Sequence, residues 1–330
     1  MDQLYTYKKN SKINELLVRI EVAKKVIDLL PRLPHIEAHL RRQSLLKSSL
    51  FSARIEGNTL ELHEVDESRK SKTREKKEVF NILKALEWIH SNKSPKLITK
   101  EVLLTLHEYV LDGIGADLGK FRQEPSAIFN QAGIAVYMTP PPTHLPFLLD
   151  QLISYTAHED DHPAVTAGVF HFTFEKIHPF IDGNGRVGRL LASLILKQRD
   201  YALRGLVSME EYFNEHRSDY YDLLSITDND ITLFVEFFLE SIAESAEKTF
   251  EQLKDVKGER AEDTLLPRRQ EILQIIREQR LCSFNMIKRR FRKIPDSSLH
   301  YDVQVLLKKG VIKKLGSTRG VVYTLNHINY

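Results

Sequence analysis

The sequence has a single cysteine, Cys282, among its 330 residues. One cysteine cannot form a disulfide within the chain, and it disfavours a metal site built from thiolates. No run of eighteen apolar residues is present, so the sequence predicts no membrane-spanning helix and no membrane partner. The first residues, Met1-Asp-Gln-Leu-Tyr, lack the basic and then apolar order of a signal peptide. Together these absences predict a cytoplasmic location.

Neither sign of charge dominates the whole chain, but the charges are unevenly distributed. The net charge is +3, with 48 Lys and Arg against 45 Asp and Glu. Residues 265–330 hold fourteen Lys and Arg against four Asp and Glu, a net charge of +10, which leaves −7 for residues 1–264. A basic module after an acidic body is typical of a separate domain and is compatible with an anionic partner.

Helical periodicity dominates the sequence, and 42% hydrophobic with 28% charged residues is ordinary for a globular protein of two or three domains. We expect helices over about 11–30, 36–55, 78–90, 99–112, 145–156, 163–176, 187–196, 209–224 and 232–250. The charged residues 65–77 lack an apolar period and predict a solvated loop or helix end. Two short runs, 126–129 and 134–138, predict a β-hairpin with its turn at 130–133.

One stretch, residues 178–189, concentrates reactive side chains between two apolar helices. It reads His-Pro-Phe-Ile-Asp-Gly-Asn-Gly-Arg-Val-Gly-Arg. The glycines let backbone N–H groups turn toward an anion, and a helix that begins near Arg186 adds its positive end. Arg186 and Arg189 are three residues apart and share a helix face. Asp182 can hold Mg²⁺ and His178 can accept a proton, so these residues predict a polyphosphate site with a base beside it.

The same stretch resembles the signature of the Fic family, His-x-Phe-x-Asp/Glu-Gly-Asn-Gly-Arg-x-x-Arg, at every fixed position. A simple corner between helices needs one glycine, not Gly-Asn-Gly followed by two spaced arginines. The resemblance implies transfer of AMP from ATP to a Ser, Thr or Tyr hydroxyl of a target protein, with release of pyrophosphate. It implies His178 as the catalytic base and Asp182 as the Mg²⁺ ligand. It implies as phosphate-binding residues Gly183, Asn184, Gly185, Arg186 and Arg189.

An earlier segment, Ser52-Ala-Arg-Ile-Glu56-Gly57, resembles the inhibitory motif of the same family, Ser/Thr-x-x-x-Glu-Gly/Asn. The resemblance implies that a helix over about 36–57 is inhibitory and that Glu56 pairs with Arg189 in place of the γ-phosphate. Without the signature, the same residues would read as a solvated last helical turn that Gly57 ends. Ser52 and Glu56 are therefore candidate regulatory residues.

The predicted hairpin, about 126–139, follows Gly119-Lys-Phe-Arg122 and precedes Pro140-Pro-Pro142, an order that resembles Fic proteins. There the hairpin is a flap whose edge binds the target segment by strand addition. The alternative is a surface hairpin without a partner.

Aromatic and imidazole residues around the signature leave two readings open. Family members often have an aromatic-rich helix near the adenine base, which makes Asn214, Tyr220 and Tyr221 candidate adenine contacts; core packing is the equal alternative. His171 lies seven residues, about two helical turns, before His178 on a similar face. It is expected to be a buried core or supporting histidine rather than a metal ligand.

The chain is expected to be mainly α, with a Fic-type helical bundle and a C-terminal winged-helix domain. The boundaries we predict are 1–95 for an N-terminal helical region, 96–254 for the Fic core and 265–330 for the winged helix. In the last region three helices precede two strands, an order that looks like a winged helix. If this domain reads DNA, the candidate contacts are Ser298, Tyr301, Gln304, Lys308 and Arg319. Docking of a protein partner or dimer assembly is the alternative, and family members often form homodimers.

Three other functions stay open from the sequence. Fic scaffolds also transfer UMP, phosphate or phosphocholine, or remove AMP with the inhibitory glutamate. A DNA-binding regulator could use the core to sense a nucleotide, although the intact His178 argues against an inactive core. An assembly scaffold would form a stable oligomer and modify nothing.

Overall fold

The computed structural model of the chain describes residues 5–29, 34–65, 73–129, 135–157, 160–254, 265–316 and 320–326. The turn expected at 130–133, the linker expected at about 255–264, and Arg319 lie outside these residues. Two compact units are present, and each is described by itself. The larger comprises residues 1–31, 44–59 and 71–255, and the smaller comprises 32–43, 60–70 and 256–330. No helix in the described part of the chain is long and apolar enough to cross a membrane.

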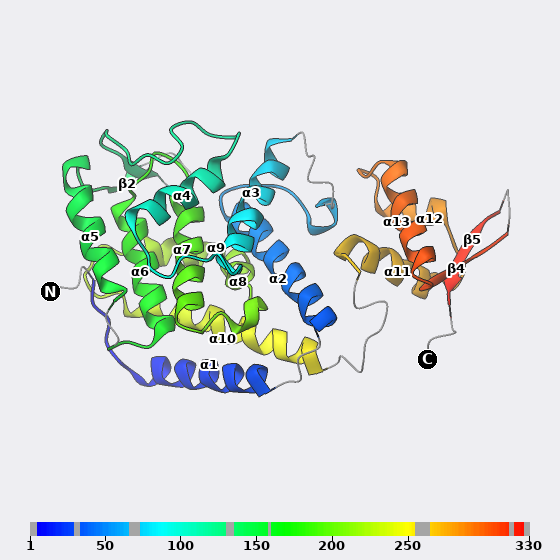
Figure 1. The fold of residues 1–330 in the computed structure, drawn as a ribbon, viewed down its shortest axis with the longest axis horizontal. Coiled ribbons are helices and arrows are strands. Elements are labelled where there is room, and N and C mark those ends of the chain that lie inside the picture. The colour runs from blue at the N-terminus through cyan, green and yellow to red at the C-terminus, as the bar shows by residue number, and fades with distance from the viewer. Residues whose placement is uncertain are drawn as a thin grey trace. The chain divides into compact units, whose positions relative to one another are not determined.

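The larger unit is built almost entirely of helices (Figure 1). Its helices are α1 (Ser11–Leu29), the C-terminal part of α2 (Pro34–Ile55), α3 (Arg74–Ile89), α4 (Lys100–Leu111), α5 (Leu145–Tyr155), α6 (Pro163–Ile177), α7 (Asn184–Gln198), α8 (Met209–Glu215), α9 (Arg217–Leu224) and α10 (Thr232–Lys254). Two short 3₁₀ turns, η2 (Pro142–His144) and η3 (Leu203–Gly205), lie between them. The mainly α fold expected from the sequence is confirmed.

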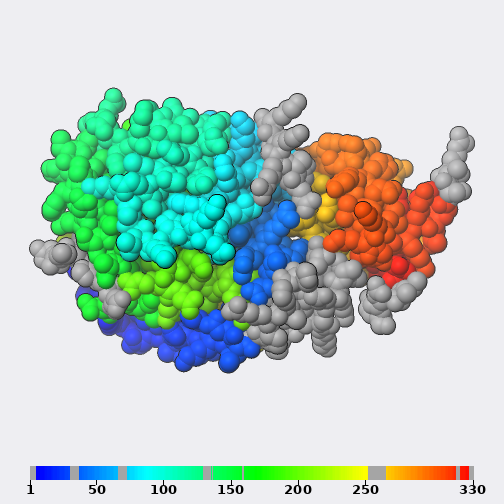
Figure 2. Space-filling view, viewed as in Figure 1, coloured from blue at the N-terminus to red at the C-terminus, as the bar shows by residue number. Residues whose placement is uncertain are grey.

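The core of this unit forms around α6 and α7. Every residue of α6 from Ala164 to Ile177 is buried, because α6 packs against α5, α7 and α10. The helix α4 packs against α7, and α3 packs against both. Figure 2 shows residues of the α3–α4 region, in cyan, over much of the near face of this unit. The connection between the two central helices, residues 178–183, is therefore held by packing at both of its ends.

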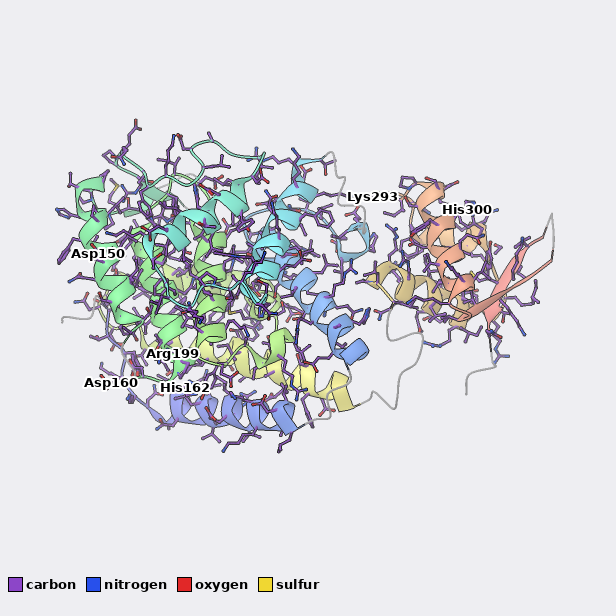
Figure 3. All side chains as sticks on the ribbon, viewed as in Figure 1. Asp150, Asp160, His162, Arg199, Lys293 and His300 are labelled. Atoms are coloured by element: carbon purple, nitrogen blue, oxygen red, sulfur yellow. The ribbon has the colours of Figure 1, made fainter. Side chains whose placement is uncertain are left out.

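The N-terminal helix α1 is fixed to the side of this core. It packs along α10, where Arg19 forms two hydrogen bonds of 2.8 Å with the carboxylate of Glu247. Glu21 of α1 lies 3.0 Å from Nε2 of His162, the residue before α6, which Figure 3 labels. The helix α1 therefore helps to hold α6, the helix that leads to His178.

The strands β1 (Ala127–Phe129) and β2 (Ala135–Met138) pair in antiparallel fashion, with Ala127 opposite Met138. Thr139 closes the base of this hairpin, because its N–H and its Oγ1 both donate to the carbonyl of Ser126, at 3.2 and 2.7 Å. We call this hairpin with its closing residues, 126–139, the flap.

Two differences from the expected helices have a clear local cause. The helix α3 begins at Arg74, four residues early, because Oγ1 of Thr73 accepts a hydrogen bond from the N–H of Lys76 and caps it. The stretch 209–224 is two helices rather than one, because His216 has non-helical angles (φ −111°, ψ 42°). Both differences arise from local backbone geometry that apolar periodicity does not report.

The smaller unit contains α11 (Pro267–Gln279), β3 (Cys282–Ser283), α12 (Phe284–Arg290), α13 (Asp296–Lys308), β4 (Ile312–Leu315) and β5 (Val322–Leu325). The expected three helices and two strands are present, and β3 joins them in the order β3-β5-β4. Asp302, which is buried, accepts from Nε of Arg268 and of Arg269 at 2.5 and 2.9 Å. His300, labelled in Figure 3, stacks on Phe284 with 3.7 Å between ring centres.

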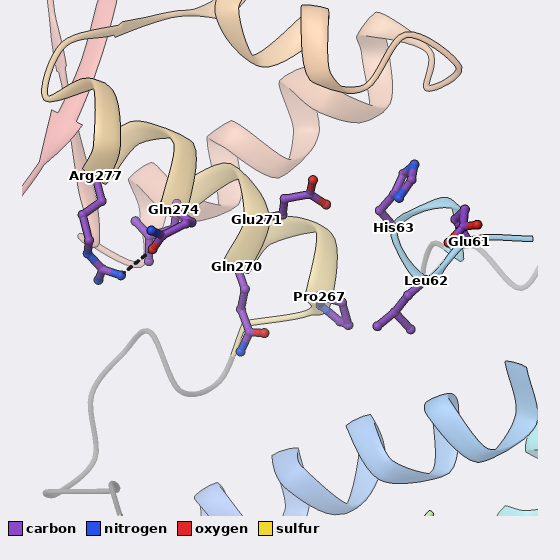
Figure 4. A pocket seen from close by; sticks show the side chains of 9 residues that line it. Glu61, Leu62, His63, Pro267, Gln270, Glu271, Gln274 and Arg277 are labelled. Atoms are coloured by element: carbon purple, nitrogen blue, oxygen red, sulfur yellow. Dashed lines mark hydrogen bonds between the residues drawn. The ribbon is translucent and has the colours of Figure 1, made fainter. Parts of the chain in front are cut away.

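This unit also includes residues on both sides of the segment 44–59 that carries Glu56. After that segment, η1 (Leu62–Glu64) packs on α11, and the ring of His63 lies 5.8 Å from that of Phe291. A cavity of about 590 Å³ lies between η1 and α11 (Figure 4). It is lined by Glu61, Leu62, His63, Pro267, Gln270, Glu271, Leu273, Gln274 and Arg277. None of these belongs to the signature.

Candidate active site

The loop between α6 and α7 is closed by Asn184. Its side chain accepts from the N–H of Phe180 and donates to the carbonyl of the same residue, both at 2.9 Å. His178 at one side of this closure and Gly183 at the other adopt left-handed conformations, with φ of 49° and 86°. Asn184 then begins α7, and the first-turn N–H groups of a helix have no intrahelical acceptor. The amide side chain of Asn184 therefore shapes the loop, while the backbone N–H groups of the following turn are the ones predicted to bind an anion.

His178 is held as a neutral base. Its Nδ1 lies 3.2 Å from the carbonyl oxygen of Glu175, and a carbonyl can only accept, so Nδ1 carries the proton. Nε2 therefore has the lone pair. Burial lowers the pKa of His178, which outweighs the carbonyl of Glu175 and the carboxylates of Glu56 and Asp182 that act in the other direction. The imidazole is thus ready to accept a proton at neutral pH.

Arg186 joins the loop to α3. Its two terminal nitrogens donate to Oε1 of Glu78 at 2.5 Å and to Oδ1 of Asp182 at 2.7 Å. Asp182 also accepts from the N–H of Gly183 at 2.6 Å, while its side chain is 53% exposed. The charge of Arg186 is therefore already balanced by two carboxylates, and the exposed edge of Asp182 faces solvent.

His107 of α4 supports the same loop. Its ring stacks on Phe180 with 3.9 Å between ring centres. Nδ1 accepts from the N–H of Gly119 at 3.0 Å, so Nε2 carries the proton and donates to the carbonyl of Asp182 at 3.1 Å. Burial lowers the pKa of His107 and favours this neutral form.

Arg189 in α7 is 1% exposed and its donors are directed at α2. Nε donates to Oγ of Ser52, and one terminal nitrogen donates to the carbonyl of Ser52, both at 2.9 Å. The same nitrogen lies 2.8 Å from Oε1 of Glu56. The contact between Glu56 and Arg189 that the family resemblance implies is therefore present.

The carboxylate of Glu56 lies over the first turn of α7. A Cβ atom built on Gly185 would overlap Oε1 of Glu56, so only glycine leaves room for the carboxylate here. Burial acts to raise the pKa of Glu56, but the charges of Arg189 and Arg186 outweigh it and hold that pKa below its usual value. An anion thus already occupies the turn at which phosphate binding was predicted.

Behind Arg189 lies a buried polar cluster. Nε2 of His171 is 2.8 Å from the hydroxyl of Tyr220, which lies 3.4 Å from Arg189. Burial lowers the pKa of His171 to about 3 and raises that of Glu175 to about 8. A Cβ on Gly188 would overlap Oε1 of Glu175, so this glycine permits the close approach of α6 and α7. His171 is therefore a neutral, buried supporting residue.

The three candidate adenine contacts occupy different environments. Tyr220 is 1% exposed and stacks on Phe213, with 4.9 Å between ring centres. The hydroxyl of Tyr221 donates to the carbonyl of Ile55 at 2.9 Å, and Asn214 is partly exposed in α8. The surroundings of Tyr220 favour the packing alternative, and the adenine role of the three stays a prediction.

The sequence reasoning missed four residues of this site: Glu78, His107, Arg122 and Glu175. Glu78, His107 and Arg122 reach the loop from other helices or from the segment before the flap, whereas Glu175 lies in α6, the helix that leads into the loop. Only Arg122 carried a signal, as the last residue of the Gly119–Arg122 run. No spacing pattern could find Glu78 and His107, because their contacts are tertiary, and the role of Glu175 depends on its burial, which spacing does not report.

Asp182 fits a Mg²⁺ ion that arrives with a nucleotide. Among the described residues no group of three or more His, Cys, Asp or Glu could hold a metal ion unaided. Mg²⁺ in phosphate sites, however, takes one or two carboxylates together with phosphate oxygens and water. A single, half-exposed carboxylate beside an anion-binding turn is that donor set.

The amino-acid sequence of this chain is similar to those of known proteins. Residues 97–196 match the profile of the Fic/DOC family. The chain is 28% identical over 250 residues to a protein adenylyltransferase Fic of Culex quinquefasciatus and 30% identical over 240 residues to that of Drosophila grimshawi. These alignments cover 71% and 68% of this chain but 47% and 46% of the relatives. The chain thus spans about half the length of the curated relatives it matches.

Solved structures show the same fold. A Fic family protein from Desulfovibrio desulfuricans G20 superposes with a TM-score of 0.68 at 24% identity, over all of both chains. A fragment of Fic-1 from C. elegans superposes with a TM-score of 0.57 at 21% identity, covering 73% of this chain and 72% of that one.

Proposed function

Because this chain belongs to the Fic/DOC family, we propose that it is a protein adenylyltransferase that moves AMP from ATP to a Ser, Thr or Tyr hydroxyl of a target protein. One observation carries the proposal. A carboxylate, that of Glu56, lies over the first turn of α7 and is paired with Arg189. A turn that accommodates this anion suits the phosphates of a nucleotide, because helix N-termini favour negative charge.

In the reaction, the phosphates bind at residues 183–186 and Arg189 holds the γ-phosphate with its planar fork. Nε2 of His178 takes the proton of the target hydroxyl as the hydroxyl oxygen attacks the α-phosphorus. The new O–P bond forms while the bond from the α-phosphorus to the bridging oxygen breaks, and pyrophosphate leaves. Such a positioned base contributes roughly 10²–10⁴-fold to the rate. Mg²⁺ on Asp182 would neutralise phosphate charge when bound.

Glu56 inhibits this reaction in our proposal, because it occupies Arg189 and the first turn of α7. An incoming γ-phosphate would meet a like charge there. Removal of the Glu56 carboxylate would leave both groups available to ATP.

Labelled ATP tests the reaction. The Glu56→Gly protein is incubated with a lysate, Mg²⁺ and ATP labelled in the α- or the γ-phosphate. We expect protein-bound label from α-labelled ATP alone, and none with the additional change His178→Ala. The exposed His144 offers a matched control, since His144→Ala should retain the transfer. Label from γ-labelled ATP would indicate phosphate transfer instead, and no label from either would contradict the proposal.

The smaller unit supports a second proposal, that it is a winged-helix domain that binds nucleic acid. Tyr301, Gln304 and Lys308 of α13 are exposed, and Tyr301 is 60% exposed. Lys313 and Lys314 on β4 are exposed as well. Binding to random duplex DNA should weaken steeply with salt, and Lys308→Glu should weaken the binding and make its salt dependence shallower, because one phosphate contact is lost. DNA binding that does not change with salt concentration would instead favour a protein as the partner of this unit.

A further inference from the structure

Arg122 is a buried arginine that joins the catalytic loop to the flap. It is 2% exposed and lies between α4 and β1 in the chain. Its Nε donates to the carbonyl of His178 at 2.8 Å, and its own N–H donates to the carbonyl of Pro179 at 2.9 Å. Its terminal nitrogens donate to the carbonyls of Glu124 at 3.0 Å and Pro140 at 2.5 Å.

These acceptors come from three places that must keep a fixed relation. Glu124 lies just before β1, and Pro140 lies just after β2, so the two carbonyls mark the base of the flap. The carbonyl of His178 marks the end of α6. A guanidinium is planar and offers its donors in a rigid fork, so one side chain fixes the relative positions of all three acceptors.

The partners of Arg122 are unusual for its burial. Buried charges are ordinarily paired with an opposite charge. Among the described residues, the hydrogen bonds of the Arg122 side chain go to backbone carbonyls, and no carboxylate forms an ion pair with it. Burial consequently lowers the pKa of Arg122. Because no carboxylate balances the charge, the planar shape of the Arg122 guanidinium must matter here as well as its charge.

The backbone of His178 needs such support. A left-handed conformation is unfavourable at a residue other than glycine and persists only where the surroundings impose it. His178 has φ 49°, and its carbonyl is the one that Arg122 holds. The bond therefore acts on the backbone that sets the direction of the imidazole.

We propose that Arg122 is a positioning residue that fixes the backbone of His178 to the ends of the two flap strands. The imidazole of His178 and the target-binding edge of the flap then keep fixed relative positions. This inference rests on the proposed function, in which His178 is the base and the flap binds the target. Arg122 does not touch the reacting atoms; it acts through His178 and through the ends of both flap strands.

Substitution can separate the charge of Arg122 from the planar hydrogen-bonding geometry of its guanidinium. The charged groups that face His178 are Glu56 and Asp182, which raise its pKa, and Arg122, which lowers it. Arg122→Met removes both the charge and the fork. Arg122→Lys keeps the charge and loses the fork. A residue that merely fills space would give the same His178 titration in both variants and would leave the flap exchange of Arg122→Lys unchanged.

The test uses the full chain with Glu56→Gly and measures three quantities. NMR titration of ring-labelled histidine should give a higher His178 pKa in Arg122→Met than in Arg122→Lys, which should match the parent. Amide exchange in β1 and β2 should rise in both variants. AMP transfer should fall about a hundredfold in both, since small displacements cost about that much, while the Kd for ATP changes less than twofold. Lys120→Met, which removes an exposed charge two residues earlier, is the matched control.

The outcomes decide the proposal. Unchanged flap exchange in a folded Arg122→Lys variant, or equal His178 titration in the Met and Lys variants, would overturn it. If Arg122→Met does not fold, the Lys variant decides through exchange and ATP affinity. The titration and exchange measurements do not need AMP transfer. If the Glu56→Gly protein transfers no AMP, the proposed function is contradicted, but the structural role of Arg122 can still be tested.

Discussion

Oε1 of Glu56 at the end of α2 lies 2.8 Å from Arg189 in α7, although 133 residues separate them in the chain. The arginine side chain is 1% exposed and the glutamate side chain 31% exposed. An exposed ion pair contributes only about 0–1 kcal/mol, whereas moving a population from 1:99 to 99:1 takes about 5.5 kcal/mol. The pair between Glu56 and Arg189 is sheltered rather than exposed, so its contribution can exceed that of an exposed pair.

The groups around the Glu56–Arg189 pair add to the inhibition that we propose. Ser52 holds Arg189 by two further hydrogen bonds, so the guanidinium is directed at α2. The carboxylate also fills the space over Gly185 at the start of α7. In our proposal, inhibition combines occupation of Arg189, steric exclusion and like-charge repulsion of phosphate.

Glu78 provides a test of how the loop is anchored. Glu78→Gln should lower the free energy of unfolding by about 1–2 kcal/mol, because it removes one charge from a mostly buried pair with Arg186 while Asp182 remains. Urea denaturation measures this loss. Glu75→Gln, an exposed change on the same helix, is the control and should have a smaller effect, because it removes only a first-turn charge at the helix N-terminus. Equal midpoints for the two variants would contradict the anchoring role.

Glu175 predicts a pH dependence of stability. Its pKa is raised from 4.5 to about 8 by burial, so between these values the folded protein retains a proton that the unfolded chain has lost. The contribution of Glu175 to stability must therefore fall as pH rises from about 4.5 to about 8, by up to about 1.4 kcal/mol per pH unit, whereas that of His171, whose pKa is lowered to about 3, rises as pH approaches the ordinary histidine value. Glu175→Gln, a neutral isostere, should remove this slope from unfolding curves measured at several pH values. An identical slope in both proteins would show that Glu175 is ionised in the fold.

Much of the site was predictable because its chemistry is local in sequence. Residues 178–189 placed the base, the carboxylate, the glycines and both arginines within one connection and one helix. The same local reasoning predicted that Gly57 ends α2, and it has φ 100° there. Helical periodicity also predicted the buried α6.

The remainder depends on contacts that spacing does not encode. The partner of Arg186 on α3 is one glutamate among many charged residues near its helix start, so nothing in the pattern singles it out. His107 lies within a predicted helix and belongs to no motif, yet its two ring nitrogens connect two loops. The pairing of Glu56 with Arg189 came from family resemblance, since no periodicity relates residues so far apart.

The affinity for ATP of the wild-type and Glu56→Gly proteins tests the central claim most directly. Titration calorimetry with ATP and Mg²⁺ should show at least tenfold tighter binding after the change, together with AMP transfer from α-labelled ATP that depends on His178. The result follows from freeing Arg189 and the first turn of α7. Equal affinity and equal transfer in the two proteins would contradict the account, because Glu56 would then not compete for the phosphate site.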